Sequence, residues 1–172
     1  EDFKNMEFFN ESSFHFKGLD LLNSSEIFIS DYSIRFQNFF NMKIEDIYEK
    51  ERTIDDLISK QPLQNEKNNS NDRDVNEFSD EVVGQKILSY AIGCMMGRYS
   101  LDEPGLIYAH AGNQDFDASR YQTFPADADG IIPLTEMHWF EDDATHRLRE
   151  FLTAVWGKDT LDANMLWLAE SL

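Results

Sequence analysis

The stretch from Val82 to Tyr99 constrains the fold of this chain most, because it reads as one buried helix. Its apolar residues recur three, four or one positions apart, which places them in a single stripe on an α-helix: Ile87, Leu88, Ala91, Ile92, Met95, Met96 and Tyr99. On another side of this helix, Gly93 and Gly97 leave the backbone bare, so a second element can approach closely. The uncharged run from Ile87 to Gly97 is shorter than the roughly 20 residues that a membrane span needs. The sequence therefore predicts a core helix of a soluble protein.

Helical patterns also precede this stretch. From Asp31 onward, apolar residues follow a helical stripe: Phe36, Phe39, Phe40, Ile44 and Ile47. A separate helix is predicted from Thr53 to Lys60, because Thr53 can cap it, Asp56 stands three residues later and Pro62 ends it. For the Val82–Tyr99 helix, Ser79 or Asp80 is the expected cap.

The last third of the chain predicts two more helices. Glu141, Asp142 and Asp143 stand at the start of the first, where the helix dipole favours acids, and Gly157 is expected to close it as a left-handed cap. Its stripe is Ala144, Leu148, Phe151, Leu152 and Val155. Thr160 is expected to cap the final helix, whose apolar face is Leu161, Met165, Leu168, Ala169 and Leu172.

These patterns predict a mainly α fold, an irregular helical bundle with long acidic loops and at most a few short strands, for which Phe14–Phe16 and Leu106–Ala109 are candidates. Three segments are expected. Residues 1–60 form an aromatic-rich helical segment and residues 81–172 a helical domain. Residues 61–80 are rich in Asn, Asp, Glu, Gln and Ser, which predicts a flexible polar linker.

The charge balance argues against direct contact with nucleic acid. The chain has 15 basic and 33 acidic residues, a net charge of −18. Both halves share the excess, with 9 basic and 19 acidic residues before Gly84 and 6 and 14 after it. Nucleic-acid affinity comes from clustered Lys and Arg, whereas the only local basic pair here is Arg147 with Arg149. A protein that imitates DNA stays compatible with this charge.

The single cysteine suggests a cellular location for the protein, and the first residue suggests how the chain relates to a longer polypeptide. Cys94 lies on the apolar helix, so an intramolecular disulfide is impossible and a cytoplasmic location is the default. We interpret Cys94 as a buried apolar residue rather than a reactive thiol. The sequence opens at Glu1 without an initiator Met or a signal segment, and we expect an excised piece of a longer polypeptide.

A weak calcium-loop pattern is the main candidate for a metal site. Asp127, Asp129, Gly130 and Glu136 match the later part of a helix-loop-helix calcium loop, but Pro125 occupies the first ligand position. An acidic turn before a helix is the favoured interpretation, and no metal is expected.

Two carboxylate-imidazole pairs also have helical spacing, His138 with Glu141 and Asp142 with His146. Local ion pairing at a helix start explains them better than a ligand set, since no second pair of the same kind completes one. His15 and His110 are isolated, and no Ser or Cys lies in a nucleophile elbow. The eight glycines include no phosphate-cradling loop, so no catalytic or cofactor-binding residue is predicted.

Three stretches resemble the PglX-type adenine-specific DNA methyltransferases of the BREX phage-exclusion systems. The first is LSYAIGCMMGRYSLDEPGLIYA, residues Leu88 to Ala109. The second is YQTFPADADGIIPL, residues Tyr121 to Leu134. The third, WFEDDATHRLREFLTAVWGKDTLDANMLWLAESL, runs from Trp139 to Leu172. The resemblance covers mainly residues 88–172 and concerns structural features, a helix, a glycine-bearing turn and an acidic helix start.

The resemblance implies a parent enzyme that transfers a methyl group from S-adenosylmethionine to the amine of adenine in DNA, as in restriction-modification enzymes. Such enzymes carry an F-x-G-x-G-like loop and an [ND]-P-P-[YF] motif, and both are absent here. The segment is then a non-catalytic scaffold whose partners are other domains of the parent or other proteins of the defence system. DNA is reached through the parent, and no membrane contact is expected. A stand-alone acidic interaction protein or DNA mimic, which binds a basic partner, is the alternative.

Overall fold

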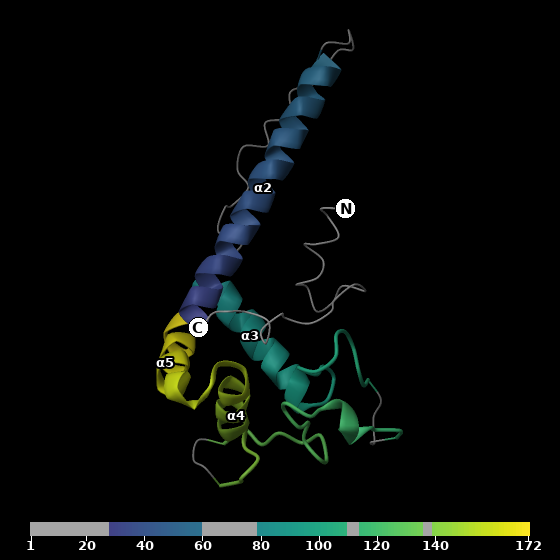
Figure 1. Cartoon of the computed structure of the whole chain (residues 1–172), viewed down its shortest axis with the longest axis vertical. Coiled ribbons are helices and arrows are strands. Elements are labelled where there is room, and N and C mark those ends of the chain that lie inside the picture. The colour runs from purple at the N-terminus through teal and green to yellow at the C-terminus, as the bar shows by residue number, and fades with distance from the viewer. Residues whose placement is uncertain (1–27, 60–78, 110–113, 136–138) are drawn as a thin grey trace.

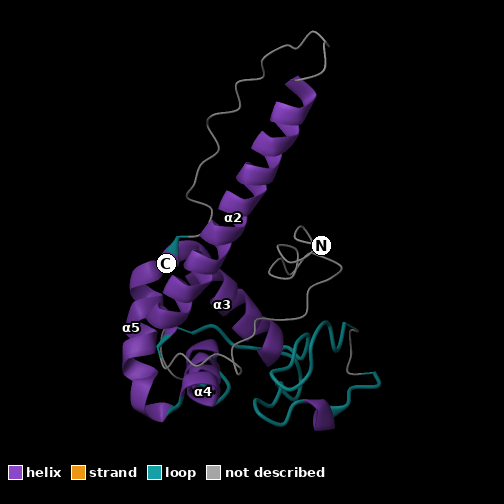
Figure 2. Cartoon of the chain, turned by 45° about the horizontal axis from the view of Figure 1, so that its top comes forward, coloured by secondary structure: helices purple, strands orange, loops and turns teal. Residues whose placement is uncertain are grey.

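The computed structural model describes residues 28–59, 79–109, 114–135 and 139–172. These residues form four helices and two single 3₁₀ turns: α2 Ile29–Ser59, α3 Asp80–Met95, η1 Ala118–Arg120, α4 Ala144–Trp156, η2 Lys158–Thr160 and α5 Leu161–Ser171. No strand occurs within the described ranges, which confirms the mainly α fold (Figure 2). The strand expected at Leu106–Ala109 is wrong, because that segment is irregular. Phe14–Phe16 and almost all of the 61–80 linker lie outside the described residues, and the three-segment division stays a prediction.

The central helix α3 begins where the sequence predicted. Ser79 is its N-cap, and the Ser79 side chain accepts a hydrogen bond from the Val82 amide. Asp80 and Glu81 lie in the first turn, where acids interact favourably with the helix dipole. Local sequence signals are therefore sufficient to place this end.

The other end of α3 comes earlier than predicted. The helix stops at Met95 rather than Tyr99, because Gly97 adopts a positive φ of 71°. The Arg98 amide donates to the Gly93 carbonyl at 2.8 Å and the Gly97 amide to the Cys94 carbonyl at 3.0 Å. This pair of bonds is a Schellman motif, in which a left-handed glycine ends a helix. Gly97 therefore turns the chain instead of extending the helix.

The buried side of α3 is also turned slightly from the predicted stripe. Ile92 and Met96 are 42% and 47% exposed, although the stripe included them. The helix residues that do enter the core are Val83, Ile87, Tyr90, Ala91, Cys94 and Met95. Cys94 is buried and reduced, as expected for a small apolar residue in the core.

A close approach at Gly93 confirms the prediction of bare backbone on this helix. A Cβ at Gly93 would lie 2.4 Å and 2.6 Å from two carbon atoms of the Tyr99 ring. The approaching group is thus an aromatic side chain that follows the Gly97 turn. At the other end of α3, a Cβ at Gly84 would meet the Ser171 hydroxyl oxygen of α5 at 2.5 Å, so a glycine that the sequence analysis had not singled out permits a second close contact.

The N-terminal helical region is one continuous helix rather than two. α2 runs through Thr53, whose hydroxyl donates to the Glu49 carbonyl at 2.8 Å, four residues earlier. Thr53 is therefore an interior residue and not the cap of a second helix. Threonine can bond to its own helix in this way, so its presence alone does not mark a helix start.

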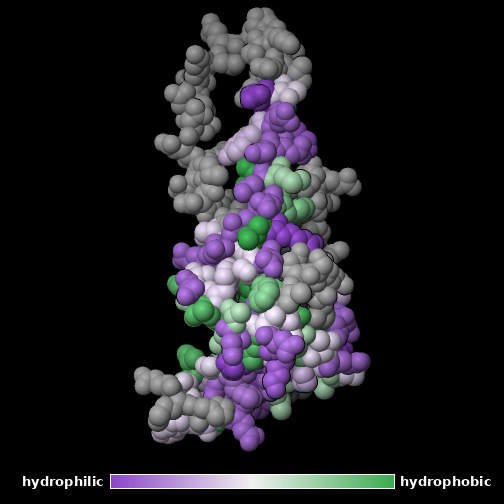
Figure 3. Space-filling model, turned by 60° about the vertical axis from the view of Figure 1, so that its left-hand side comes forward, coloured by the Kyte–Doolittle hydropathy of each residue, from purple (hydrophilic) through white to green (hydrophobic). Residues whose placement is uncertain are grey.

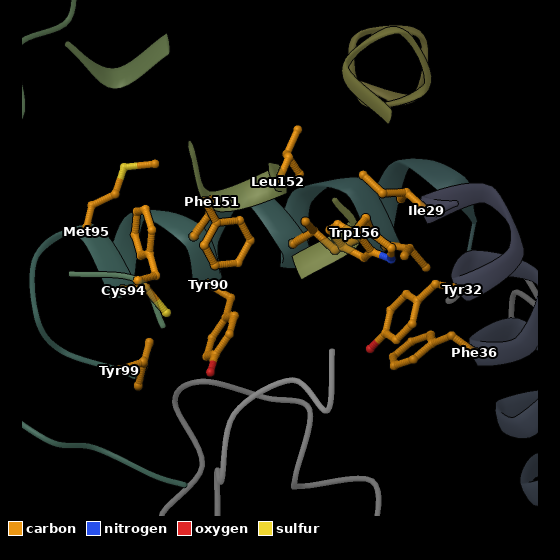
Figure 4. Packing of buried hydrophobic residues seen from close by; sticks show 14 of the residues in the cluster. Ile29, Tyr32, Phe36, Tyr90, Cys94, Met95, Tyr99, Phe151, Leu152 and Trp156 are labelled. Carbon is orange, nitrogen blue, oxygen red and sulfur yellow. The ribbon is translucent and has the colours of Figure 1, made fainter. Parts of the chain in front are cut away.

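One hydrophobic core joins the first part of α2 to α3 and α4. Figure 4 shows Tyr32 and Phe36 of α2 beside Trp156 of α4, with Tyr90 of α3 near Phe151. The rings of Tyr32 and Trp156 meet edge to face at 6.4 Å, and those of Tyr90 and Phe151 at 6.3 Å. The aromatic content of the sequence thus fills the space between helices.

The outer part of α2 projects away from this core as an arm (Figure 1). Its exposed side chains include Met42 and Ile54, 68% and 54% exposed. On the face that Figure 3 presents, green hydrophobic atoms form separate spots among purple hydrophilic atoms. Scattered apolar residues of this kind are normal on a protein surface.

The ends of the two C-terminal helices agree with prediction only in part. Asp143 caps α4, and its side chain accepts from the His146 amide at 2.8 Å. Gly157 closes α4 with φ 87°, but its ψ of 165° is extended rather than left-handed helical. Thr160 is the N-cap residue of α5, as expected, but its side chain forms no capping bond, because its hydroxyl donates back to the Trp156 carbonyl at 3.0 Å. On α5, Leu168 is buried, whereas Leu172 is 55% exposed.

Candidate functional site

Polar residues gather in the loops that follow α3, and three long-range hydrogen bonds fasten these loops to the C-terminal end of the helix. Tyr90 donates to the Ser100 carbonyl at 3.1 Å, and Tyr121 donates to the Gly97 carbonyl at 2.6 Å. The Asp127 amide donates to the Met95 carbonyl at 2.7 Å. Burial raises the pKa of Tyr90 well above its usual range, so its hydroxyl stays a neutral donor.

Asp102 is the centre of a hydrogen-bond cluster in these loops. Its carboxylate accepts from the backbone amides of Gln122 and Thr123 at 2.7 Å and 3.0 Å, and from the Thr123 hydroxyl. Ser100 joins it, since the Asp102 amide donates to the Ser100 hydroxyl at 3.0 Å and that hydroxyl donates to the Arg120 carbonyl at 2.7 Å. Burial alone would raise the pKa of Asp102, but bonds from Thr123, Gln122 and Ser100 hold it below the usual value.

An ion pair beside this cluster ties the same two loop segments together. The Arg120 guanidinium donates through both Nε and Nη2 to one carboxylate oxygen of Glu103. The hydrogen bond from Arg120 lowers the pKa of Glu103 below its usual value. We call Ser100, Asp102, Glu103, Arg120 and Thr123 the Asp102 cluster. Each member forms a hydrogen bond or an ion pair with another segment of the chain. The cluster therefore holds the two loop segments together.

The calcium-loop candidate forms a hydrogen-bonded turn. The Asp127 carboxylate accepts from the amides of Asp129 and Gly130 at 3.0 Å and 2.8 Å, and Asp129 accepts from the Ile131 amide at 2.9 Å. Glu136 lies outside the described residues, so the third candidate ligand is not placed. Partial burial opposes ionisation of Asp127, yet hydrogen bonds from Asp129 and the following amides lower its pKa. The carboxylate oxygens of Asp127 and Asp129 accept hydrogen bonds from backbone amides, as in an acidic turn.

The histidine pairs are also local. His146 lies 3.4 Å from Glu150, one turn later on α4, whereas the sequence had paired it with Asp142. Asp142 and His146 do line a shallow hollow of about 530 Å³, together with Asp127 and Glu141. His138 lies outside the described residues. Within those that the structure describes, no three His, Cys, Asp or Glu side chains gather closely enough to hold a metal ion.

Of the basic pair, Arg147 packs against a loop, whereas the Arg149 side chain is 44% exposed beside an acid. The Arg147 guanidinium carbon lies 4.5 Å from the centre of the Phe124 ring, and its nitrogens contact the Pro125 carbonyl and Glu150. Arg149 is 3.4 Å from Asp162 of α5. Arg147 thus fastens the loop before residue 126 to α4.

The Asp102 cluster was missed by the reasoning from sequence. The run Asp102-Glu103-Pro104-Gly105 has the composition of a turn, which many proteins share. Its partners lie about 20 residues later, and no local spacing connects Asp102 with Thr123 or Glu103 with Arg120. A run of acids beside a proline turn was the only available signal.

The described residues thus hold a helical core with polar loops bonded onto it. In that part of the chain, no helix has the length and apolar run to cross a membrane. The polar side chains of the Asp102 cluster and of the Asp127 turn form hydrogen bonds with neighbouring backbone and side chains. These bonds stabilise the loops.

Comparison with known proteins finds two methyltransferases. No protein-family model matches the chain. Over 107 residues, 60% of the chain, it is 48% identical to the adenine-specific methyltransferase BrxX of Escherichia coli O9:H4 (strain HS). Over 87 residues, 49% of the chain, it is 45% identical to the adenine-specific methyltransferase PglX of Lacticaseibacillus casei (strain Zhang). The matched parts amount to 9% and 7% of those relatives' lengths. Over about half its length, the chain is therefore a PglX-type segment, homologous to a small part of the BrxX and PglX adenine-specific methyltransferases.

Proposed function

We propose that this chain is a non-catalytic helical scaffold within an adenine-specific DNA methyltransferase of a BREX-type phage-defence system. The observation that carries the proposal is the 48% identity to BrxX over 107 residues, a short part of a much longer enzyme. The sequence contains neither the N-P-P-Y-type motif nor the glycine-rich loop that adenine methyltransferases use. In this proposal, S-adenosylmethionine and the flipped adenine bind elsewhere on the parent enzyme.

The geometry supports a scaffold. Ser100, Asp102 and Arg120 are bonded to neighbouring loops, which suits a fixed structural role. The core runs from α2 through α3 to α4, so the segment has the packing of a rigid unit. A rigid unit of this kind can hold neighbouring domains of an enzyme at a fixed geometry.

A methyl-transfer assay with the isolated chain tests the absence of catalysis. The 172-residue protein is incubated with labelled S-adenosylmethionine and an adenine-containing duplex, with E. coli BrxX as the positive control. We expect no incorporation of label by the isolated chain. Transfer above background by the purified chain would overturn the scaffold proposal.

A segment exchange tests membership in the enzyme. In E. coli BrxX, the homologous segment is replaced by that of this chain, and adenine methylation of DNA is measured in cells. We expect methylation to persist, because 48% identity preserves the fold of the segment. The matched control carries Phe151→Asp, which places a charge at a fully buried position and should abolish methylation. Loss of methylation in the exchange itself, with normal protein levels, would contradict the proposal.

The net charge of −18 favours a second candidate, an acidic protein that occupies the DNA-binding groove of a basic partner. A DNA mimic competes with duplex DNA for its partner, with strong dependence on salt. The discriminating assay adds the isolated chain to full-length BrxX on DNA. A scaffold leaves DNA binding unchanged, whereas a mimic releases the DNA at low salt and loses this effect as salt increases.

A further inference from the structure

Four large apolar side chains stand exposed just before α4. Leu134, Trp139, Ile131 and Phe140 are 86%, 71%, 65% and 50% exposed. We call these four residues the apolar patch. Trp156 is only 8% exposed and Trp167 packs against the core, whereas Trp139 is left exposed to water. All four residues of the patch lie within ten positions of the sequence, 131 to 140, and closely spaced exposed apolar residues mark interaction surfaces more often than residues scattered singly.

The start of α4 holds both parts of the apolar patch. The Ala144 amide donates to the Pro133 carbonyl at 2.8 Å, which fixes the segment that carries Ile131 and Leu134. The Asp143 amide donates to the Phe140 carbonyl at 3.4 Å, and the Asp143 side chain, 4% exposed, caps the helix. Figure 1 shows this region at the end of the molecule opposite to the tip of α2. These two bonds tie the backbone on both sides of the patch to the start of α4, which reduces the conformational freedom that is lost on binding.

Acidic residues flank the apolar patch in the sequence. Asp129 stands two residues before Ile131, and Glu141 and Asp142 directly follow Phe140. Asp129 and Glu141 are exposed. A second copy of this chain would bring the same acids together, which opposes self-association through this surface. Anionic lipid and nucleic acid are repelled for the same reason. The complementary occupant is a protein surface with an apolar pocket and a rim of Lys and Arg.

We infer that the apolar patch docks this segment onto a basic-rimmed apolar surface elsewhere in the same methyltransferase, with Trp139 as the anchor. This inference rests on the proposed function. More than nine tenths of BrxX lies outside the part that matches this chain, so the relatives have ample further chain to supply the partner surface. Tryptophan is among the residues that contribute most to protein interfaces, and aliphatic neighbours exclude water around it.

Photo-cross-linking tests the docking. In the full-length methyltransferase that carries this segment, p-benzoylphenylalanine replaces Trp139, and in a control it replaces Leu166 of α5, which is 59% exposed and lies outside the patch. The expected product is a cross-link from position 139 to a Lys- and Arg-flanked peptide of the same polypeptide outside these 172 residues. No such product from position 139, or products only with a second copy or with DNA, would overturn the inference.

A variant pair separates docking from folding. Leu134→Ala with Trp139→Ala should leave the melting temperature of the isolated chain unchanged, because both side chains are exposed. In the full-length enzyme, the same pair should accelerate proteolytic cleavage next to the segment about tenfold or more, whereas Leu166→Ala should not. Equal cleavage rates for the pair and the control would contradict the docking.

The two proposals fail in different ways. If the parent enzyme methylates adenine and needs the segment, yet Trp139 forms no cross-link within the enzyme, then only the docking is wrong. If the parent transfers no methyl group, or transfers it without the segment, then the proposed function fails first. Methylation is therefore measured in parallel on each cross-linking variant.

Discussion

At the scale of single residues, Asp102 shows how one carboxylate joins two segments of the loops that follow α3. Its carboxylate accepts from two backbone amides and one hydroxyl that lie about 20 residues later. Without Asp102, these two amides and the hydroxyl would lose their acceptor within the protein. Charge-assisted bonds of this kind are stronger than neutral ones, so Asp102 adds to the bonds of Tyr90 and Tyr121 that fasten these loops to α3.

Asp102→Ala should lower the free energy of unfolding by roughly 0.5 to 1 kcal/mol at pH 7, because its hydrogen bonds are exposed and water weakens them. The pKa of Asp102 is lower in the folded chain than its ordinary value of 3.8. This stabilisation is therefore complete above that value and is lost as the pH falls through the lower folded pKa. Urea unfolding at pH 7 and pH 3 measures the effect, and the difference between variant and wild type should shrink at pH 3.

The control for this change is Asp162→Ala. The Asp162 side chain is 95% exposed and lies 3.4 Å from Arg149, a geometry that contributes little. Its loss should change stability by less than about 0.5 kcal/mol. If Asp102→Ala lowered the free energy of unfolding by the same amount at pH 7 and at pH 3, the ionised carboxylate would not be the source of the stabilisation.

Gly93→Ala should destabilise the protein by about 1 to 3 kcal/mol, because the added methyl group overlaps the Tyr99 ring. The ring stacks on Tyr90 with centroids 5.4 Å apart, so its displacement also disturbs the bond from Tyr90 to Ser100. Thermal unfolding gives the stability, and near-ultraviolet circular dichroism reports the tyrosine packing. Ser89→Ala, at an exposed position of the same helix, is the control and should change stability by less than about 0.5 kcal/mol. A stable Gly93→Ala variant with unchanged tyrosine signal would contradict the contact.

Residue-level prediction succeeded where the chemistry is local. Asp143 and Ser79 were expected at helix starts, since each bonds to an amide three residues later. Gly93 was expected to permit a close approach, and it does. The partners of Asp102 were not predictable, because the fold, rather than the sequence spacing, brings them together.

At the scale of elements, Asn164 joins three segments at the base of α2. Its Oδ1 accepts from the Ile29 amide at 3.0 Å, and its Nδ2 donates to the Thr160 hydroxyl at 3.2 Å. Asn164 is 1% exposed, so these groups have no access to water. The first amide of α2 thereby obtains a partner from α5, which is distant in sequence.

Asn164→Leu should lower the free energy of unfolding by about 1 to 3 kcal/mol, although leucine has a similar size and favours helices. The reason is that the Ile29 amide loses its acceptor inside the protein. Hydrogen exchange should show faster exchange of that amide, and urea unfolding gives the free energy. The matched control is Ala163→Leu, at the exposed neighbouring position. If both leucine variants were equally stable, Asn164 would not hold α2 to α5.

The helices show which element boundaries a sequence can define. The start of α3 and of α4 followed from capping residues, but α2 was predicted as two helices because Thr53 resembled a cap. A threonine can also bond to its own helix, and the surrounding sequence does not separate the two cases. The end of α3 was placed too late because the stripe of apolar residues continues to Tyr99, which belongs to the next segment and folds back over Gly93.

At the scale of the whole molecule, the helices form one core from which α2 projects (Figure 1). The apolar patch lies at the opposite end of the molecule from the tip of α2. A segment with an arm at one end and a docking surface at the other suits the proposed place between domains of a larger enzyme. The fold class followed from helical periodicity, whereas this arrangement depends on contacts such as Ser33 with Asp80, 47 residues apart.

The net charge of −18 gives the last prediction. Repulsion among surface carboxylates destabilises a compact acidic chain, and salt screens it. The melting temperature should therefore rise between about 10 and 200 mM NaCl, where the Debye length falls from about 30 Å to below 10 Å. Glu170, in the last turn of α5, adds to the repulsion and also opposes the helix dipole.

Glu170→Gln should raise the stability at low salt by about 0.3 to 1 kcal/mol and reduce the gain from added NaCl. Scanning calorimetry at two salt concentrations measures both effects. Lys158→Gln is the control in the opposite direction, because it removes one of the few positive charges and should increase the dependence on salt. A melting temperature that falls with NaCl would show instead that ion pairs such as Arg120 with Glu103 outweigh the repulsion, since salt weakens attractive pairs as well.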